Sequence, residues 1–230
     1  MWSLPLAAAV ISGVFCSLLI RAASRRPRPH LVAWATALAM FALASGAAAV
    51  GMAAGWTTAW FRVYYLFGAI VNVPVLAAGS TYLLAPRRVG HLFAVAVAVL
   101  AIGAAHDVVT ADLATEALAT PGIPAGAEVV PAAVRSLSRY LSFGGFFVVV
   151  GGALWSAWRL ARRGGTAARR LAAANLLIAT GTFVVAVGSG FARYGRGRFF
   201  ALGLAVGVTL MFAGFLKTHA AAPRAAGSGG

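Results

Sequence analysis

Apolar residues are arranged along this chain in seven long runs that are separated by short basic or polar stretches. A run of about 20 apolar residues forms a helix that is long enough to cross the ~30 Å hydrocarbon core of a bilayer. The pattern therefore predicts an all-α fold, a polytopic membrane bundle of seven transmembrane helices. The expected spans are residues 4–20, 31–54, 60–84, 91–105, 137–160, 171–192 and 199–216.

Composition supports this class and argues against a soluble one. The chain is 61% hydrophobic and 10% charged, with a mean hydropathy of +0.88, whereas about a quarter of the residues in soluble domains are charged. Its net charge of +15 would suit a nucleic-acid partner only if the basic residues gathered on a water-facing surface. They lie between apolar runs instead, so we expect the lipid bilayer as the partner and no nucleic acid.

The arginines predict an orientation, because cytoplasmic loops of membrane proteins are enriched in Arg and Lys. With the N-terminus outside and the C-terminus in the cytoplasm, thirteen of the 19 basic residues face the cytoplasm and all four acidic residues lie outside. Nearly every basic residue is arginine, with Lys217 the single lysine, and alanine and glycine are abundant, as in G+C-rich bacteria. We therefore expect a multi-pass protein of the bacterial inner (cytoplasmic) membrane.

A single transmembrane domain, residues 1–219, is expected, followed by a flexible cytoplasmic tail at 220–230. The longest connection is an outer loop at about 106–136, which contains all the carboxylates. Its first half has apolar residues at helical intervals and predicts a short surface helix before a Pro-Gly turn. Glycine pairs such as Gly203 with Gly207, and Gly181 with Gly188, favour close helix packing.

Polar residues in two spans share helix faces. In the third span Tyr65 and Asn72 lie seven residues apart, and Pro74 should disturb the helix beside Asn72 because proline has no backbone N–H. The sixth span has a similar row. Polar side chains at membrane depth normally point into the bundle, either to fix helix register by hydrogen bonds or to line a small polar cavity. The candidate ligand-binding residues are Arg62, Tyr65, Asn72, Asn175, Thr182 and Ser189.

Several function classes lack the residues that they require. Proton-coupled transport usually needs a carboxylate at mid-membrane depth, and no span contains one. Lys217 lies at a helix end, which disfavours a retinal protein, and His91 and His106 are about 22 Å apart on one helix, too far to share a haem. No metal-ligand or nucleophile motif is present, so we expect no cofactor, no metal and no enzymatic activity. His106 with Asp107 is a candidate ionisable cluster at the outer surface.

The third span also resembles a known module. Its Tyr65, Leu66, Gly68, Ala69 and Pro74 follow the order found in the third helix of the seven-helix sensor module of bacterial histidine kinases. The resemblance covers this one helix and implies a sensory role. The whole chain is similar to seven-helix membrane proteins of actinobacteria, a similarity that implies no particular activity. About a dozen residues follow the seventh span, so a signal would pass through a separate partner.

Two function hypotheses follow. The first is a non-enzymatic sensor or accessory module that binds a lipid-like or small-molecule ligand or a membrane protein partner. The second is a small transporter or channel with a polar path between the third and sixth spans. A third possibility, an enzyme acting on lipid, would need a nucleophile or metal constellation at the membrane surface.

Overall fold

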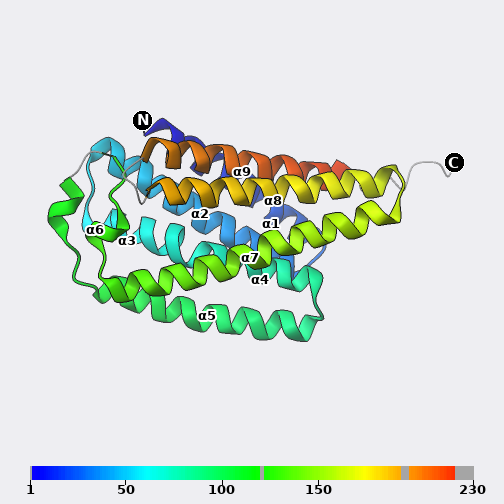
Figure 1. Ribbon diagram of the computed structural model, residues 1–230, viewed down its shortest axis with the longest axis horizontal. Coiled ribbons are helices and arrows are strands. Elements are labelled where there is room, and N and C mark those ends of the chain that lie inside the picture. The colour runs from blue at the N-terminus through cyan, green and yellow to red at the C-terminus, as the bar shows by residue number, and fades with distance from the viewer. Residues whose placement is uncertain (1, 120–121, 193–196, 221–230) are drawn as a thin grey trace.

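The computed structural model describes residues 2–119, 122–192 and 197–220, and within these ranges its regular elements are all helices (Figure 1). Among the described residues, seven helices are long and apolar enough to span a membrane. These findings confirm the all-α class and the number of spans, and they indicate a multi-pass membrane protein. The spans are α1 (Ser3–Arg25), α2 (Pro29–Ala54), the continuous helix of α3 (Thr58–Tyr64), η1 (Tyr65–Val71) and α4 (Asn72–Leu84), then α5 (Arg87–Thr110), α7 (Ala132–Arg163), α8 (Thr166–Ala192) and α9 (Gly197–Ala220).

The connection between α5 and α7 is shorter than expected. Pro86 and Pro131 occupy the N-cap positions of these two helices, where a residue without an N–H costs nothing. Buried Val108 extends α5 to Thr110, so His106 and Asp107 lie on its last turns. The expected loop at 106–136 is therefore too long at both ends. Its described residues form the short 3-10 helix η2 (Thr115–Ala119) and the single turn α6 (Gly126–Val129).

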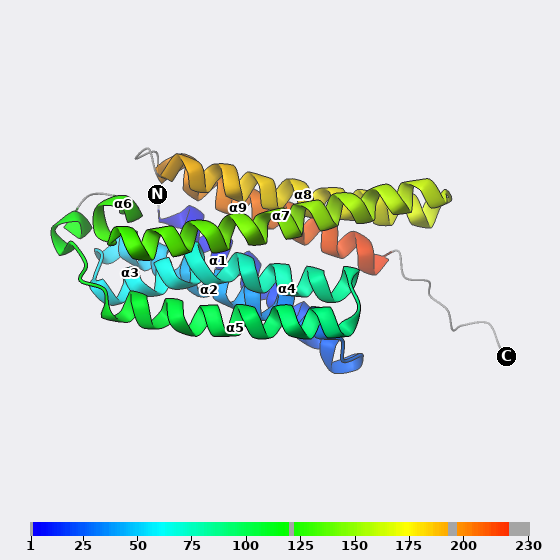
Figure 2. The same ribbon diagram turned by 60° about the horizontal axis from the view of Figure 1, so that its bottom comes forward.

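Six of the described spans form a closed ring. Along it α1 packs on α2, α2 on α4, α4 on α7, α7 on α8, α8 on α9 and α9 on α1. The helix α5 lies outside the ring, mainly against α4 (Figure 2). The end that carries α6 and the start of α3 is called the loop end here. The helix α1 begins at the loop end and α9 runs away from it, so the two described termini lie at opposite ends of the bundle (Figures 1 and 2).

Glycines allow α8 and α9 to approach closely, as their spacing predicts. A Cβ atom built on Gly188 would lie 3.2 Å from the Cα of Gly203, and one on Gly203 would lie 3.0 Å from the Cα of Gly188. Further along the same two helices, a Cβ atom built on Gly181 would lie 2.5 Å from the carbonyl oxygen of Gly207. The hydrophobic effect does not drive helices together inside a bilayer, because lipid tails are as apolar as the side chains. Close backbone packing is therefore a main source of helix association there.

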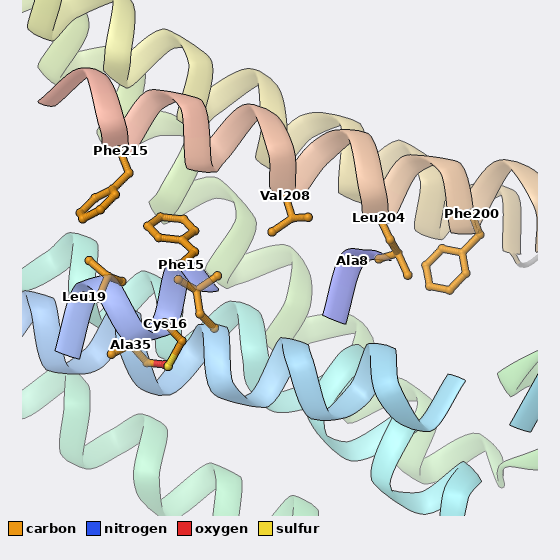
Figure 3. Packing of buried hydrophobic residues seen from close by; sticks show 10 residues of the cluster. Ala8, Phe15, Cys16, Leu19, Ala35, Phe200, Leu204, Val208 and Phe215 are labelled. Atoms are coloured by element: carbon orange, nitrogen blue, oxygen red, sulfur yellow. The ribbon is translucent and has the colours of Figure 1, made fainter. Parts of the chain in front are cut away.

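One face of α9 closes the ring against α1 and α2. Figure 3 shows Phe200, Leu204, Val208 and Phe215 pointing from α9 toward the other two helices. The rings of Phe15 and Phe215 lie 4.8 Å apart between their centroids. This packing holds the last helix beside the first and encloses the space at the centre of the ring.

Candidate ligand-binding cavity

A cavity of about 660 Å³ lies inside the helix ring. Ligand sites in proteins typically measure about 300–1,000 Å³ and are mostly apolar with a few polar groups, and this cavity has both properties. The helices α2, α7, α8 and α9 and the continuous helix of α3, η1 and α4 form its walls. Its large apolar side chains are Leu38, Phe41, Phe143, Phe146, Phe183, Phe200, Leu204, Val208 and Met211.

The cavity extends from the loop end past the middle of the bundle, since it reaches Ala37 on α2 and Leu76 on α4. On α7 its lining extends from Arg135 to Phe146, eleven residues and therefore about 16 Å along the helix axis. At this depth and beyond, small residues bring the helices together: a Cβ atom on Gly145 would lie 2.9 Å from the backbone carbon of Val73. The side chain of Trp34 packs against Gly79 further along α4. The described walls thus approach one another below the cavity.

An irregular stretch of the third span forms one wall. Pro74 has no N–H to bond the carbonyl of Ile70, and the preceding residues Tyr65–Val71 are wound as a π-helix rather than an α-helix. The predicted disturbance beside Asn72 is therefore present. The carbonyl oxygen of Ala69 in this stretch accepts two hydrogen bonds from α7, from Ser138 Oγ at 2.9 Å and Ser142 Oγ at 2.6 Å. These bonds attach the irregular wall to α7.

Four of the six candidate ligand-binding residues line this one cavity. They are Tyr65 and Asn72 from the third span and Thr182 and Ser189 from α8. The buried Asn72 side chain also fixes helix position, because its Nδ2 donates to the carbonyl oxygen of Ala37 on α2 at 2.8 Å. The two alternatives derived from the sequence, helix register and a cavity, therefore apply together at Asn72.

The other two candidates lie outside the cavity lining. The Nδ2 of Asn175 donates to Ser156 Oγ at 3.0 Å, a contact between α8 and α7. The Nη2 of Arg62 donates to the carbonyl oxygen of Ala111 at 3.1 Å, and its buried Nε has no hydrogen-bond partner among the described residues. Asn175 thus joins two helices, and Arg62 holds the end of α5 against α3.

The outer ionisable cluster is an exposed contact. His106 Nδ1 lies 3.6 Å from a carboxylate oxygen of Asp107, and both side chains are at least half exposed. Among the described residues, this is the one ion pair found. Surface pairs of this kind contribute little to stability.

Two arginines line the cavity although the sequence analysis did not select them. Arg135 and Arg139 lie one turn apart near the start of α7, at the loop end of the cavity. They were assigned to the outer loop and the first residues after it. A signal in the sequence could have identified them. Pro131 marks the start of a helix, and the buried residues Val134 and Ser138 follow at an interval of four, so Arg135 and Arg139 lie next to the buried face.

The connection between α5 and α7 covers the cavity at the loop end. Residues 124–127 are part of its lining, and a Cβ atom on Gly126 would lie 2.6 Å from the ring of Tyr65. This segment is attached by Trp56 Nε1, which donates to the carbonyl oxygen of Gly122 at 2.6 Å. Arg135 Nη1 donates to the carbonyl oxygen of Ala127 at 2.7 Å. We call residues 122–130 the cap.

Among the described residues, no three His, Cys, Asp or Glu side chains are grouped so that they could hold a metal ion. Comparison of the chain with protein-family models, with curated proteins and with solved structures gave no match.

Proposed function

We propose that this protein is a non-enzymatic membrane module that binds a lipid-like or small-molecule ligand in the cavity and acts as a sensor or accessory subunit. The observation that carries the proposal is the partly open cavity of about 660 Å³ lined by five spans. Its apolar walls lack the dispersion contacts of a packed interior, and a ligand that fills the space gains them.

The construction of the ring suits a sensor. Across the cavity, the half formed by α1, α2 and α4 meets the half formed by α7, α8 and α9 mainly where α4 packs on α7 and α1 packs on α9, and the ring of Phe200 on α9 also contacts Tyr64 on α3. A ligand that contacts both halves favours one spacing between them and so shifts the population of conformations. A membrane protein partner that contacts these helices would transmit the change.

The distribution of charge supports the orientation within a bacterial inner membrane. All four acidic residues belong to the end of α5 or to the connection at the loop end. The opposite end carries the arginines of the α1–α2, α4–α5 and α7–α8 connections, including Arg26, Arg88 and Arg163. With that end in the cytoplasm the protein follows the positive-inside rule, and the cap faces outward.

Native mass spectrometry of the protein released from its own membrane in a mild detergent tests the proposal. We expect the wild-type protein to retain a bound small molecule. Ala186 lines the cavity on α8, so Ala186→Phe should fill part of it and abolish the adduct, whereas Ala173→Phe, at an exposed position of the same helix, should retain it. A bare protein in all three samples would contradict a ligand-binding role.

A second candidate function, a small transporter, is favoured by one observation: Asn72 and Thr182 line the same cavity from helices on either side of it. Its test is solute flux in proteoliposomes. Flux that is lost in Asn72→Ala would favour transport, and flux that is the same in liposomes with and without the protein would exclude it.

A further inference from the structure

We infer that the ligand of this cavity is an anionic amphiphile, with its acidic head group bound by Arg135 and Arg139 at the loop end and its hydrocarbon chain among the phenylalanines. The inference rests on the proposed function and specifies its ligand. It depends on three properties of the lining: where charge lies, which hydroxyl groups are already bonded, and where the apolar side chains gather.

Charge of one sign lies at one end of the cavity. Among the described residues, Arg135 and Arg139 are the charged side chains of the lining, and no described carboxylate is part of it. The one ion pair in the described part of the chain is His106 with Asp107, so neither arginine is neutralised by a described carboxylate. Arg135 uses one N–H for the Ala127 carbonyl, and no described residue accepts a hydrogen bond from the exposed Arg139.

An arginine guanidinium presents five N–H donors in a fixed plane that matches carboxylate and phosphate oxygens. Two such groups lie one helical turn apart at the capped end of the cavity, and the described protein uses few of their donors. Charge-assisted hydrogen bonds of this kind are about twice as strong as neutral ones. An acidic head group is the chemical class that these donors recognise.

Four hydroxyl groups of the lining already donate to the protein. Ser138 and Ser142 both donate to the Ala69 carbonyl, while Thr182 donates to Ile178 and Ser189 to Val185, each at 2.9 Å. Since each hydroxyl has one hydrogen, these four have no donor left for a ligand. The other hydroxyl groups of the lining belong to Ser45, Tyr64 and Tyr65, too few to replace the hydrogen bonds that a sugar makes with water.

The inner half of the cavity is suited to a chain of methylene groups. Phe146, Phe183 and Met211 line it, together with the face of α9 that bears Leu204 and Val208. From Arg139 to Phe146 the lining therefore changes from charged to apolar within seven residues, about 10 Å of helix. A single-chain amphiphile with a carboxylate or phosphate head matches this order.

The experiment uses four probes added to the delipidated protein and quantified by native mass spectrometry. They are palmitate, hexadecyl phosphate, hexadecan-1-ol and inorganic phosphate. We expect the two acidic amphiphiles to bind at least tenfold more tightly than the alcohol, and inorganic phosphate to compete with neither at similar concentration. Comparing palmitate with hexadecyl phosphate identifies which acidic head is preferred.

The variant Arg139→Gln should reduce the preference for acid over alcohol at least fivefold. It removes a charge that makes no hydrogen bond or ion pair within the described protein, so folding should be preserved. Arg163→Gln, the same change on an exposed turn at the other end of α7, is the matched control and should keep the full preference.

The possible failures are distinguishable. If hexadecan-1-ol binds as tightly as palmitate, or if Arg139→Gln leaves the preference unchanged, the assignment of an anionic head is wrong while a ligand-binding cavity stands. If inorganic phosphate displaces hexadecyl phosphate at equal concentration, the hydrocarbon chain of the amphiphile contributes nothing to binding, and the inference is overturned. If none of the three chain compounds binds, the inference is overturned, whereas the proposed function is decided separately by the adduct that the freshly extracted protein retains.

Discussion

The side-chain amide of Asn72 on α4 donates a hydrogen bond of 2.8 Å to the backbone carbonyl oxygen of Ala37 on α2, at the wall of the cavity. The bond joins neighbouring helices of the ring where one of them has just changed from π-helical to α-helical winding. A single buried polar side chain thus fixes the position of a helix and shapes a cavity.

Replacing this amide should weaken the bundle. We expect Asn72→Leu, which keeps the number of side-chain heavy atoms and removes the bond, to lower the free energy of unfolding by about 0.5–2 kcal/mol, as for other hydrogen bonds between membrane helices. Unfolding in mixed micelles of increasing dodecyl sulfate measures it. Asn175→Leu, whose partner is the half-buried Ser156, should cost less. Equal stability of Asn72→Leu and the wild type would refute the structural role of the bond.

The crossing of α8 and α9 should not tolerate a side chain at Gly188. A leucine there must displace the backbone of Gly203, so Gly188→Leu should lower the free energy of unfolding by about 1–3 kcal/mol. Gly103 on α5 has open space around its Cβ position, and Gly103→Leu should change stability by about 0.5 kcal/mol or less. Thermal unfolding of the two variants in one detergent makes the comparison, and similar melting temperatures would count against the packing described.

The cap should loosen when its hydrogen bond from Trp56 is removed. Trp56→Phe keeps an aromatic ring in the cluster with Phe61 and Tyr64 but cannot donate to Gly122. We expect amide hydrogen exchange in residues 122–130 to become several-fold faster while exchange in α8 and α9 stays the same. Trp60→Phe, at an exposed position, is the control. Unchanged exchange in the cap of Trp56→Phe would show that this bond does not hold it.

Orientation can be measured directly with fused reporters. With the N-terminus outside, alkaline phosphatase fused to the N-terminus should be active in bacterial cells, and green fluorescent protein fused to the C-terminus should fluoresce. The physical reason is the cytoplasmic excess of arginine at the end of the bundle opposite the loop end. The reverse pair of results would place the cap in the cytoplasm.

The sequence predicted seven spans because six of the apolar runs have the length that a bilayer requires and the remaining one, 91–105, is a few residues shorter. It also predicted close packing at the glycines of α8 and α9, since glycines seven and four residues apart stay on one helix face, but it did not predict that these two helices pack on each other. The bounds of α5 and α7 were less predictable. Whether a basic or polar turn continues a helix depends on capping prolines and on tertiary contacts such as those of buried Val108 and Val134.

The candidate site was predicted in part for a similar reason. A spacing of seven residues correctly placed Thr182 and Ser189 on one helix face. The spacing does not show how far along the bundle axis the cavity extends. Asn175 continues that spacing toward the other end of the bundle, about 10 Å beyond Thr182, where α8 packs on α7 instead of bordering the cavity. Arg139 was missed because its role depends on which part of α7 faces the cavity, a tertiary property.

The most direct test of this account is the structure of the protein in a lipid nanodisc by electron microscopy. The account predicts a hollow between α2, α4, α7, α8 and α9 that contains an elongated density, with one end at Arg135 and Arg139 and the other near Met211. A bundle in which Phe146, Phe183 and Leu204 pack directly on Phe41, leaving no space at the centre of the ring, would contradict it.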